Sequence, residues 1–200
     1  FIMKILAIET SCDETAIALV DAKGGIKQPR FKIEKNLVAS QIKIHQPFGG
    51  VVPNLAKREH LRNLPILMGQ ILGISNFQFP ISNESPKLKK QISKIDLITV
   101  TVGPGLEPAL WTGVNFARKL YADLRGLLRG STRKKKIKLI GVNHLEGHLY
   151  SNILKNIRIN KKEELFPAIA LVISGGHTSL LLMKDLTYYK KLGETRDDAV

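Results

Sequence analysis

Two segments near opposite ends of the chain share one pattern: an apolar strand, a short polar turn, a threonine and a second apolar strand. The first runs from Leu6 to Leu19 around a turn at 10–15, and the second runs from Leu171 to Leu182 around a turn at 174–177. A repeat of this kind predicts two similar lobes, each opened by a strand–turn–strand unit. Because the match is short, chance similarity is the alternative. If the repeat marks two lobes, residues 1–165 form the first lobe and residues 166–200 begin the second.

The stretch between these segments alternates apolar strands with amphipathic helices, which predicts an α/β fold. Clear strands are expected at 4–9, 16–21, 95–102, 139–143, 167–173 and 178–183, and a weaker strand at 33–44. Helices are expected at 54–73, at 108–124 and from residue 144 onward. The first helix contains Pro65, which predicts a kink or a break there. Residues 75–94 and 125–138 are rich in polar or basic side chains and are expected to form loops.

Charge and cysteine content narrow the classes of partner and compartment. The chain has 31 Lys and Arg residues against 17 Asp and Glu residues, a net charge of +14. This surplus favours a polyanionic partner, because each neutralised phosphate releases counterions. A generally basic proteome is the alternative, at even weight. The single cysteine, Cys12, excludes an internal disulfide framework, and we find no membrane span or signal peptide, so a cytoplasmic location is expected.

The segment His144-Leu145-Glu146-Gly147-His148 carries the sharpest chemical signal. Histidines four residues apart lie on one face of a helix, where both imidazoles can bind one metal ion. Surface or capping histidines are the commoner explanation of such spacing. The position favours a metal here, because the pair begins a helix directly after a strand, where open α/β sheets place their ligands.

The position of Glu146 argues against a zinc protease. In the HExxH motif of those enzymes the glutamate directly follows the first histidine and acts as the base. Glu146 stands two residues after His144, which is about 200° around a helix, so it points away from the face that the histidines share. The spacing therefore favours a metal that holds or polarises a substrate. Two histidines leave the coordination incomplete, and a carboxylate from elsewhere would complete the site.

Glycine-rich and acidic turns supply further candidate site residues. Ser174-Gly175-Gly176 lets the backbone approach phosphate oxygens closely, although an ordinary glycine hairpin turn is the alternative. Gly103-Pro104-Gly105 favours an anion at a helix N-terminus or serves as a rigid connector. Residues of the first turn are candidates for positioning a metal or phosphate, or are simply turn residues: Glu9, Ser11, Asp13 and Glu14. The remaining histidines, His45, His60 and His177, are more readily explained as structural.

Five short motifs span almost the whole chain: Lys4–Thr15, Gly49–Pro53, Gly103–Leu106, Asn143–His148 and Ser174–Thr178. Together and in this order they resemble those of the TsaD family of tRNA N6-adenosine threonylcarbamoyltransferases, formerly labelled glycoproteases. A sixth segment, Leu192 to Ala199, resembles the start of the family's next motif.

The resemblance implies a duplicated ASKHA fold, related to actin and hexokinase, around a nucleotide cleft. It implies transfer of a threonylcarbamoyl group from threonylcarbamoyl-AMP to N6 of adenosine 37 of tRNAs that read codons beginning with A. His144 and His148 match the ligands of one divalent metal, iron(II), with zinc(II) as the alternative. Residues matching the substrate-binding segment are Val172, Ile173, Ser174, Gly175 and Gly176. No side-chain nucleophile is expected, and TsaB-like and TsaE-like proteins are the expected companions.

Three departures from the family pattern bear on activity. The family continues past residue 200, and its third metal ligand is an Asp near its carboxyl end, so we expect the 200-residue chain alone to have little transferase activity. Asn54 stands where relatives have Glu, and the basic stretch 125–138, a candidate contact for tRNA phosphates or a solvated loop, is longer than usual.

A metalloprotease and a non-catalytic scaffold similar to TsaB are the alternatives to the transferase function. The paired histidines count against the scaffold, because TsaB lacks them.

Overall fold

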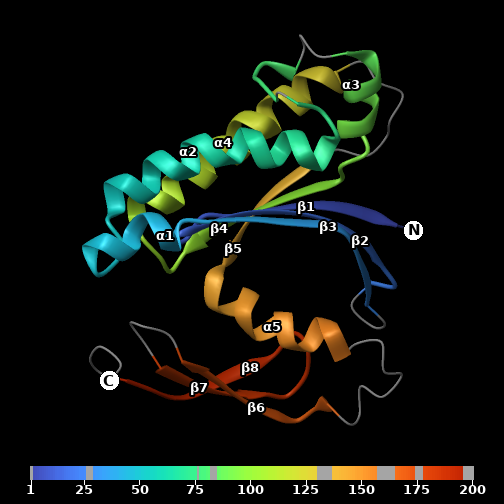
Figure 1. The fold of residues 1–200 in the computed structure, drawn as a ribbon. Coiled ribbons are helices and arrows are strands. Elements are labelled where there is room, and N and C mark those ends of the chain that lie inside the picture. The colour runs from blue at the N-terminus through green and yellow to red at the C-terminus, as the bar shows by residue number, and fades with distance from the viewer. Residues whose placement is uncertain are drawn as a thin grey trace. The chain divides into compact units, whose positions relative to one another are not determined.

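The computed structural model describes residues 2–25, 29–75, 77–81, 85–129, 137–156, 165–173 and 178–195. The chain forms two compact units, Phe1–His144 and Leu145–Val200 (Figure 1). The lobe boundary predicted between residues 165 and 166 was inferred from the sequence repeat, whereas these two units reflect how the chain packs. The lobe boundary therefore stays a prediction.

A five-stranded mixed sheet organises the first unit (Figure 1). Strands β1 (Met3–Glu9), β2 (Glu14–Lys23) and β3 (Arg30–Ser40) form an antiparallel meander. Strands β4 (Leu97–Gly103) and β5 (Lys138–Asn143) continue the sheet parallel to β1, giving the order β3-β2-β1-β4-β5. The predicted α/β class is confirmed, and the carboxyl ends of β1, β4 and β5 meet at one edge of the sheet.

Helices α2 (Pro53–Leu72) and α4 (Glu107–Leu127) run side by side over one face of this sheet (Figure 1). On α4 one row of buried residues recurs every three or four positions, as the sequence predicts: Ala109, Gly113, Ala117, Leu120 and Leu124. Each large apolar side chain taken from water contributes about 1.5–3 kcal/mol. The core between helices and sheet includes Leu6, Ile8, Ile17, Leu64, Met68, Ile98, Leu120 and Leu124. This core fixes the strand ends that carry the candidate site.

Three local expectations for the first unit were wrong in part. Helix α2 has no break at Pro65, since the buried residues on either side, Leu64 and Met68, hold both halves in one core, and a kink there stays a prediction. The strand expected at 33–44 ends at Ser40, because α1 (Ile42–His45) and a 3-10 helix (Gln46–Phe48) follow it.

The third correction concerns the segment expected to be a loop at 75–94, part of which forms α3 (Pro86–Ile92). Its first turn is capped by Ser85, whose hydroxyl oxygen accepts a hydrogen bond from the Leu88 amide at 3.4 Å. Pro86 occupies the first helical position, where proline is well tolerated. Burial of Leu88 and Ile92 then anchors this short helix on the core.

The second unit contains most of α5 (His144–Asn156), whose first residue closes the first unit, and a three-stranded antiparallel sheet. The sheet has the order β6-β7-β8, with β6 (Ala168–Ile173), β7 (Thr178–Met183) and β8 (Tyr189–Glu194). The predicted hairpin of β6 and β7 is confirmed, whereas β8 was not predicted. None of the helices in the described ranges is both long and apolar enough to cross a membrane.

Candidate active site at the carboxyl edge of the sheet

Three parallel strands bring candidate residues together at one edge of the first unit. Glu9 is the last residue of β1, Thr101 lies near the end of β4, and His144 directly follows β5. Ligands of open α/β sheets bind at the carboxyl ends of the strands, so the location is that of a binding site. The sequence separates Glu9 from His144 by most of the first unit, and only the parallel pairing of the strands joins them.

The Glu9 carboxylate accepts hydrogen bonds from three groups. The Ser11 amide donates to Oε1 at 2.5 Å, the Thr101 hydroxyl donates to Oε2, and His144 Nδ1 lies 3.3 Å from Oε2. Burial by itself would raise the pKa of Glu9, yet the bonds from His144, Ser11 and Thr101 outweigh it and lower the pKa to about 2. Glu9 is therefore ionised at neutral pH.

His144 is held through its Nδ1 atom. Besides Glu9, the Ser11 hydroxyl lies 3.1 Å from Nδ1, and the hydrogen bond with Glu9 raises the pKa of His144 against the opposing effect of burial. With Nδ1 engaged in this way, a metal ion would have to bind through Nε2. A carboxylate on the far nitrogen of a metal-bound imidazole is the usual outer-shell arrangement of protein metal sites. The donor chemistry around His144 therefore fits the expected metal.

The turn that carries Ser11 is fixed by the segment before α4. The Leu106 amide donates to the Ser11 carbonyl at 2.7 Å, and the Thr10 hydroxyl donates to the Ala109 carbonyl at 2.9 Å. A Cβ atom at Gly105 would lie 2.5 Å from the Ser11 carbonyl oxygen, so this approach requires glycine. Because the Leu106 amide is already bonded to Ser11, the contacts favour the connector interpretation of the Gly103–Gly105 segment over an anion site.

The other acidic candidates lie further along the same turn. Glu14 is exposed at the start of β2, and Asp13 is partly exposed. Burial together with the neighbouring Asp13 carboxylate raises the pKa of the Cys12 thiol to about 11, which excludes Cys12 as a reactive thiolate at neutral pH. A role of Asp13 or Glu14 toward a metal or phosphate stays a prediction.

His148 is exposed on α5, one helical turn after His144. The carboxylate of Glu146 accepts a hydrogen bond from the Tyr189 hydroxyl of β8, which raises the pKa of Tyr189 to about 12. Within the described ranges, no cluster of three or more His, Cys, Asp or Glu side chains is placed to hold a metal ion. The two histidines stay candidate ligands that need a third donor.

A pocket of about 630 Å³ lies between α5 and the sheet of the second unit. Its lining includes His148, Val172 and Ile173, so three of the predicted site residues share one cavity. Val172 is half-buried, and Ile173 is 71% exposed. The predicted substrate-binding residues Ser174, Gly175 and Gly176 lie outside the described residues.

Comparison with known proteins agrees with the motifs. The family model described as "TsaD: tRNA N6-adenosine threonylcarbamoyltransferase" matches residues 32–200. The chain belongs to the TsaD family. The five-stranded mixed sheet agrees with the expected α/β class, and the duplicated ASKHA fold stays an expectation from the family.

Curated relatives of this TsaD-family chain are named tRNA N6-adenosine threonylcarbamoyltransferase. The protein from Dictyoglomus turgidum is 42% identical over 197 residues, which cover 98% of this chain and 48% of the relative. The protein from Anoxybacillus flavithermus is 42% identical over 197 residues, covering 98% and 47%. The chain thus spans about half the length of the curated relatives it matches.

Solved structures that match the chain include YeaZ from Pseudomonas aeruginosa, with a TM-score of 0.45, 14% identity, and coverage of 96% of this chain and 66% of that chain. A Ppx/GppA family protein from Aquifex aeolicus gives a TM-score of 0.38 and 13% identity, covering 96% and 51%.

Sequence reasoning about this TsaD-family chain missed two sets of site residues. Thr101, which donates to Glu9, stands in a mostly apolar strand that also contains Thr99, and it carries no motif signal of its own. His60 contacts the Cys12 carbonyl and the Gln41 amide donates to the Asp13 carbonyl, and the sequence predicted neither contact. Buried polar residues on otherwise apolar helix faces are the one signal that points to such contacts, and His60 on α2 shows it.

Proposed function

We propose that the protein containing this chain transfers the threonylcarbamoyl group of threonylcarbamoyl-AMP to N6 of adenosine 37 in tRNAs that read codons beginning with A. Family membership over residues 32–200 supports the reaction class. The observation that carries the proposal in this molecule is the Glu9–Ser11–His144 constellation at the carboxyl edge of the sheet. It presents a preorganised polar site where this type of sheet binds ligands.

The transfer is an acyl transfer to nitrogen. The adenosine N6 atom forms a bond to the carbamoyl carbon, the bond from that carbon to the phosphate oxygen breaks, AMP leaves, and N6 loses one proton. The mixed anhydride is already activated, so a side-chain nucleophile is not required. What the protein supplies is orientation of the reacting groups and hydrogen-bond donors for the charge that develops on the carbonyl oxygen.

We propose His144 and His148 as two ligands of one divalent metal ion, iron(II) with zinc(II) as the alternative, completed by a donor from outside the chain. When bound, such an ion polarises an oxygen of the substrate as a Lewis acid. Glu9 and Ser11 hold the His144 ring by its Nδ1 atom. Ser174, Gly175 and Gly176, with Val172 and Ile173, are proposed to bind the adenylate.

A metalloprotease is a weaker candidate. Its mechanism needs a carboxylate that acts as base on metal-bound water beside the two histidines. The nearest carboxylate in sequence, Glu146, accepts a hydrogen bond from Tyr189 and lies on α5 about 200° around the helix from His144. A scaffold without catalysis is disfavoured by the paired histidines themselves.

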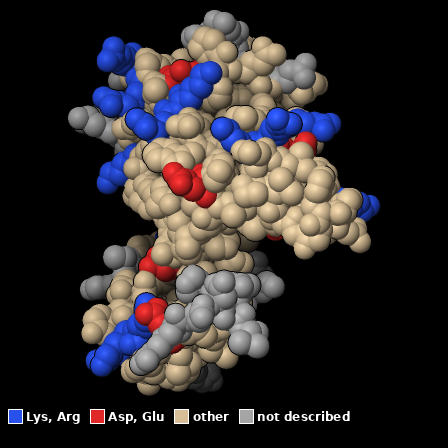
Figure 2. Space-filling view, turned by 90° about the vertical axis from the view of Figure 1, so that its left-hand side faces the viewer, with Lys and Arg blue, Asp and Glu red and all other residues tan. Residues whose placement is uncertain are grey.

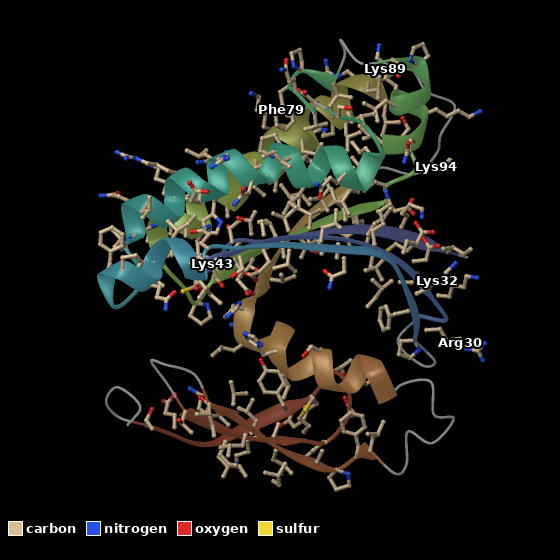
Figure 3. All side chains as sticks on the ribbon, viewed as in Figure 1. Arg30, Lys32, Lys43, Phe79, Lys89 and Lys94 are labelled. Carbon is tan, nitrogen blue, oxygen red and sulfur yellow. The ribbon has the colours of Figure 1, made fainter. Side chains whose placement is uncertain are left out.

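The proposed partners are tRNA, TsaB-like and TsaE-like proteins, with the complex located in the cytoplasm. Figure 2 shows Lys and Arg side chains gathered on the visible face of the first unit, with fewer Asp and Glu. The cations labelled in Figure 3 lie at several places in the first unit: Lys43 is on α1, Lys89 and Lys94 are at the opposite end of the unit, and Arg30 and Lys32 are on β3. This distribution supports contacts with a large polyanion.

The test is a transfer assay with preformed threonylcarbamoyl-AMP, unmodified tRNA and the companion proteins, using the chain completed at its carboxyl end. Modified adenosine is measured by mass spectrometry of nucleosides. His144→Ala and His148→Ala should each abolish product and lower bound iron, whereas Lys190→Ala, an exposed control on β8, should change neither. Absence of product with a fully metallated protein would refute the proposal, and cleavage of a glycoprotein would favour the protease.

A further inference from the structure

Four polar side chains are buried next to the turn at 10–13, which joins β1 to β2. Thr15, Gln41 and His60 are 0% exposed and His45 is 3% exposed. They come from four places in the chain: β2, the residue before α1, α1 itself, and α2. Burying so many polar groups is costly unless each is hydrogen-bonded, so the arrangement of their protons can be worked out from the contacts.

The contacts of His60 determine which nitrogen carries its proton. Nε2 lies 3.0 Å from the Cys12 carbonyl oxygen, which can only accept, so Nε2 carries the hydrogen. Nδ1 of the neutral ring is then an acceptor. It receives the Thr15 hydroxyl hydrogen at 2.7 Å, with the Gln41 amide nitrogen as a longer second donor at 3.3 Å.

The same reasoning extends to His45. The Val52 amide donates to His45 Nδ1 at 3.3 Å, so Nε2 of the neutral ring carries the hydrogen and donates to Gln41 Oε1 at 3.0 Å. The Gln41 side-chain nitrogen is thereby turned toward His60. One arrangement, with both histidines neutral, satisfies every one of these contacts.

This network ends on the turn that bears Ser11. His60 donates to the Cys12 carbonyl, and the Gln41 backbone amide donates to the Asp13 carbonyl at 2.9 Å. On the opposite side, the Leu106 amide holds the Ser11 carbonyl at 2.7 Å. The turn is therefore fixed from both sides at the point where its Ser11 hydroxyl meets His144.

We propose that His60, in its neutral Nε2–H form, is a positioning residue of the candidate active site. It holds the Cys12 carbonyl, and through it keeps Ser11 in contact with His144. The neighbouring positions of α2 on this face, Ala56 and Leu64, are apolar and fully buried, so packing alone would be served by another aliphatic residue. The expected effect of His60 on catalysis rests on the proposed function, whereas its effect on the position of the turn does not.

Two substitutions separate the two bonds of His60. His60→Gln keeps a donor that reaches the Cys12 carbonyl and loses the acceptor for Thr15, whereas His60→Asn keeps an acceptor near the Nδ1 position and loses the donor. His60→Leu removes both. Thr15→Val and Thr15→Ser form a matched pair that removes or keeps the hydroxyl bonded to Nδ1.

The measurement is amide hydrogen exchange in the full chain, at the Gln41 and Leu106 amides, which donate to the turn. His60→Asn and His60→Leu should speed exchange there by about tenfold or more, with amides of the β1–β2 ladder unchanged, and His60→Gln should restore most of the protection. Equal acceleration everywhere would mean a role in global stability only, and unchanged protection in His60→Asn would mean no role; either result overturns the proposal.

A transfer assay on the same variants separates this inference from the proposed function. If the wild-type completed protein makes product, His60→Asn should lower kcat while KM for tRNA stays within about twofold. A fall in protection at the turn combined with unchanged kcat would overturn the catalytic consequence. If the wild type makes no product at all, the proposed function fails while the exchange result still decides the positioning role.

Discussion

At the level of single residues, the Glu9 carboxylate is the group on which the hydrogen bonds of the candidate site converge. It joins the ends of β1 and β4, the turn at Ser11, and the His144 ring. A neutral amide in its place would keep the size of the side chain but would lose the charge that draws these donors together.

We therefore predict that Glu9→Gln weakens metal binding by about 10–100-fold, the usual effect of losing an outer-shell carboxylate. Isothermal titration with iron(II) under anaerobic conditions measures the affinity directly. Glu34→Gln is the matched control, because Glu34 carries the same charge and is exposed on β3, outside the candidate site. An unchanged affinity in Glu9→Gln would show that His144 is oriented by other contacts.

A second residue-scale prediction concerns pH. Burial lowers the pKa of His60 below its ordinary value of 6.5, against the opposing effects of the Cys12 carbonyl and of the Glu9 and Asp13 charges, and His45 lowers it further. The unfolded chain therefore binds a proton at His60 at a higher pH than the folded chain does. Stability from the neutral ring is present above pH 6.5 and is lost as the pH falls toward the folded-state pKa.

Urea unfolding at a series of pH values, for wild type and for His60→Gln, checks this expectation. The difference in unfolding free energy between the two proteins should shrink as the pH falls below 6.5, because only the wild type loses the neutral-ring contribution. Comparing the two proteins cancels the contribution of His144, whose raised pKa acts above pH 6.5. A difference that stays constant with pH would contradict the assigned protonation state.

At the level of elements, the packing of α4 on the turn at 10–15 is close enough to exclude a methyl group. A Cβ atom at Gly113 would lie 2.3 Å from the Thr10 hydroxyl oxygen, and Thr10 is fully buried. Further along the same helix, a Cβ atom at Gly126 would meet nothing within 4 Å. The two glycines therefore serve different purposes on one helix.

We predict that Gly113→Ala lowers the free energy of unfolding by about 1–3 kcal/mol through overpacking. Gly126→Ala should instead raise it by about 0.5–1 kcal/mol, because alanine loses less backbone freedom in a helix. Denaturant unfolding followed by circular dichroism measures both. If both variants were stabilised, Thr10 would have to move aside without cost, and the close packing of α4 would be less important than the geometry indicates.

Helices and strands could be predicted where the local sequence carries a signal, and they could not be predicted where tertiary contacts determine the structure. The strands at 4–9 and 95–102 followed from their apolar runs. At Pro65 the local sequence predicts a kink or a break, because proline is disfavoured inside a helix, whereas the core contacts on both sides keep α2 continuous. Strand β8 has six exposed residues and no apolar alternation, so only its backbone pairing with β7 defines it.

At the level of the whole molecule, the sequence identified the family and the two histidines but not the assembly of the site. The ordered motifs are a property of the chain and can be read along it. The contact of Glu9 and Ser11 with His144 joins residues more than 130 positions apart, and it depends on β1, β4 and β5 pairing in parallel. Pairing between distant strands leaves no trace in local periodicity, which is why Thr101 was missed as a site residue. His60 was missed because its contact with the Cys12 carbonyl arises from the packing of α2.

The net charge of +14 gives the last prediction, which concerns tRNA. If the lysines and arginines of the first unit neutralise tRNA phosphates, counterions are released, and the logarithm of the affinity falls linearly with the logarithm of salt concentration. Three such contacts would give a slope of about −2.1 to −2.7, an affinity loss of roughly 20–40-fold between 50 and 200 mM salt. Filter binding of unmodified tRNA measures it. Replacing Lys89 and Lys94 by Gln should reduce the slope by about two if both contact phosphates, with Lys43→Gln as the test of the opposite end of the unit. A slope near zero in the wild type would show that these cationic side chains do not contact tRNA phosphates and that the positive charge serves solubility instead.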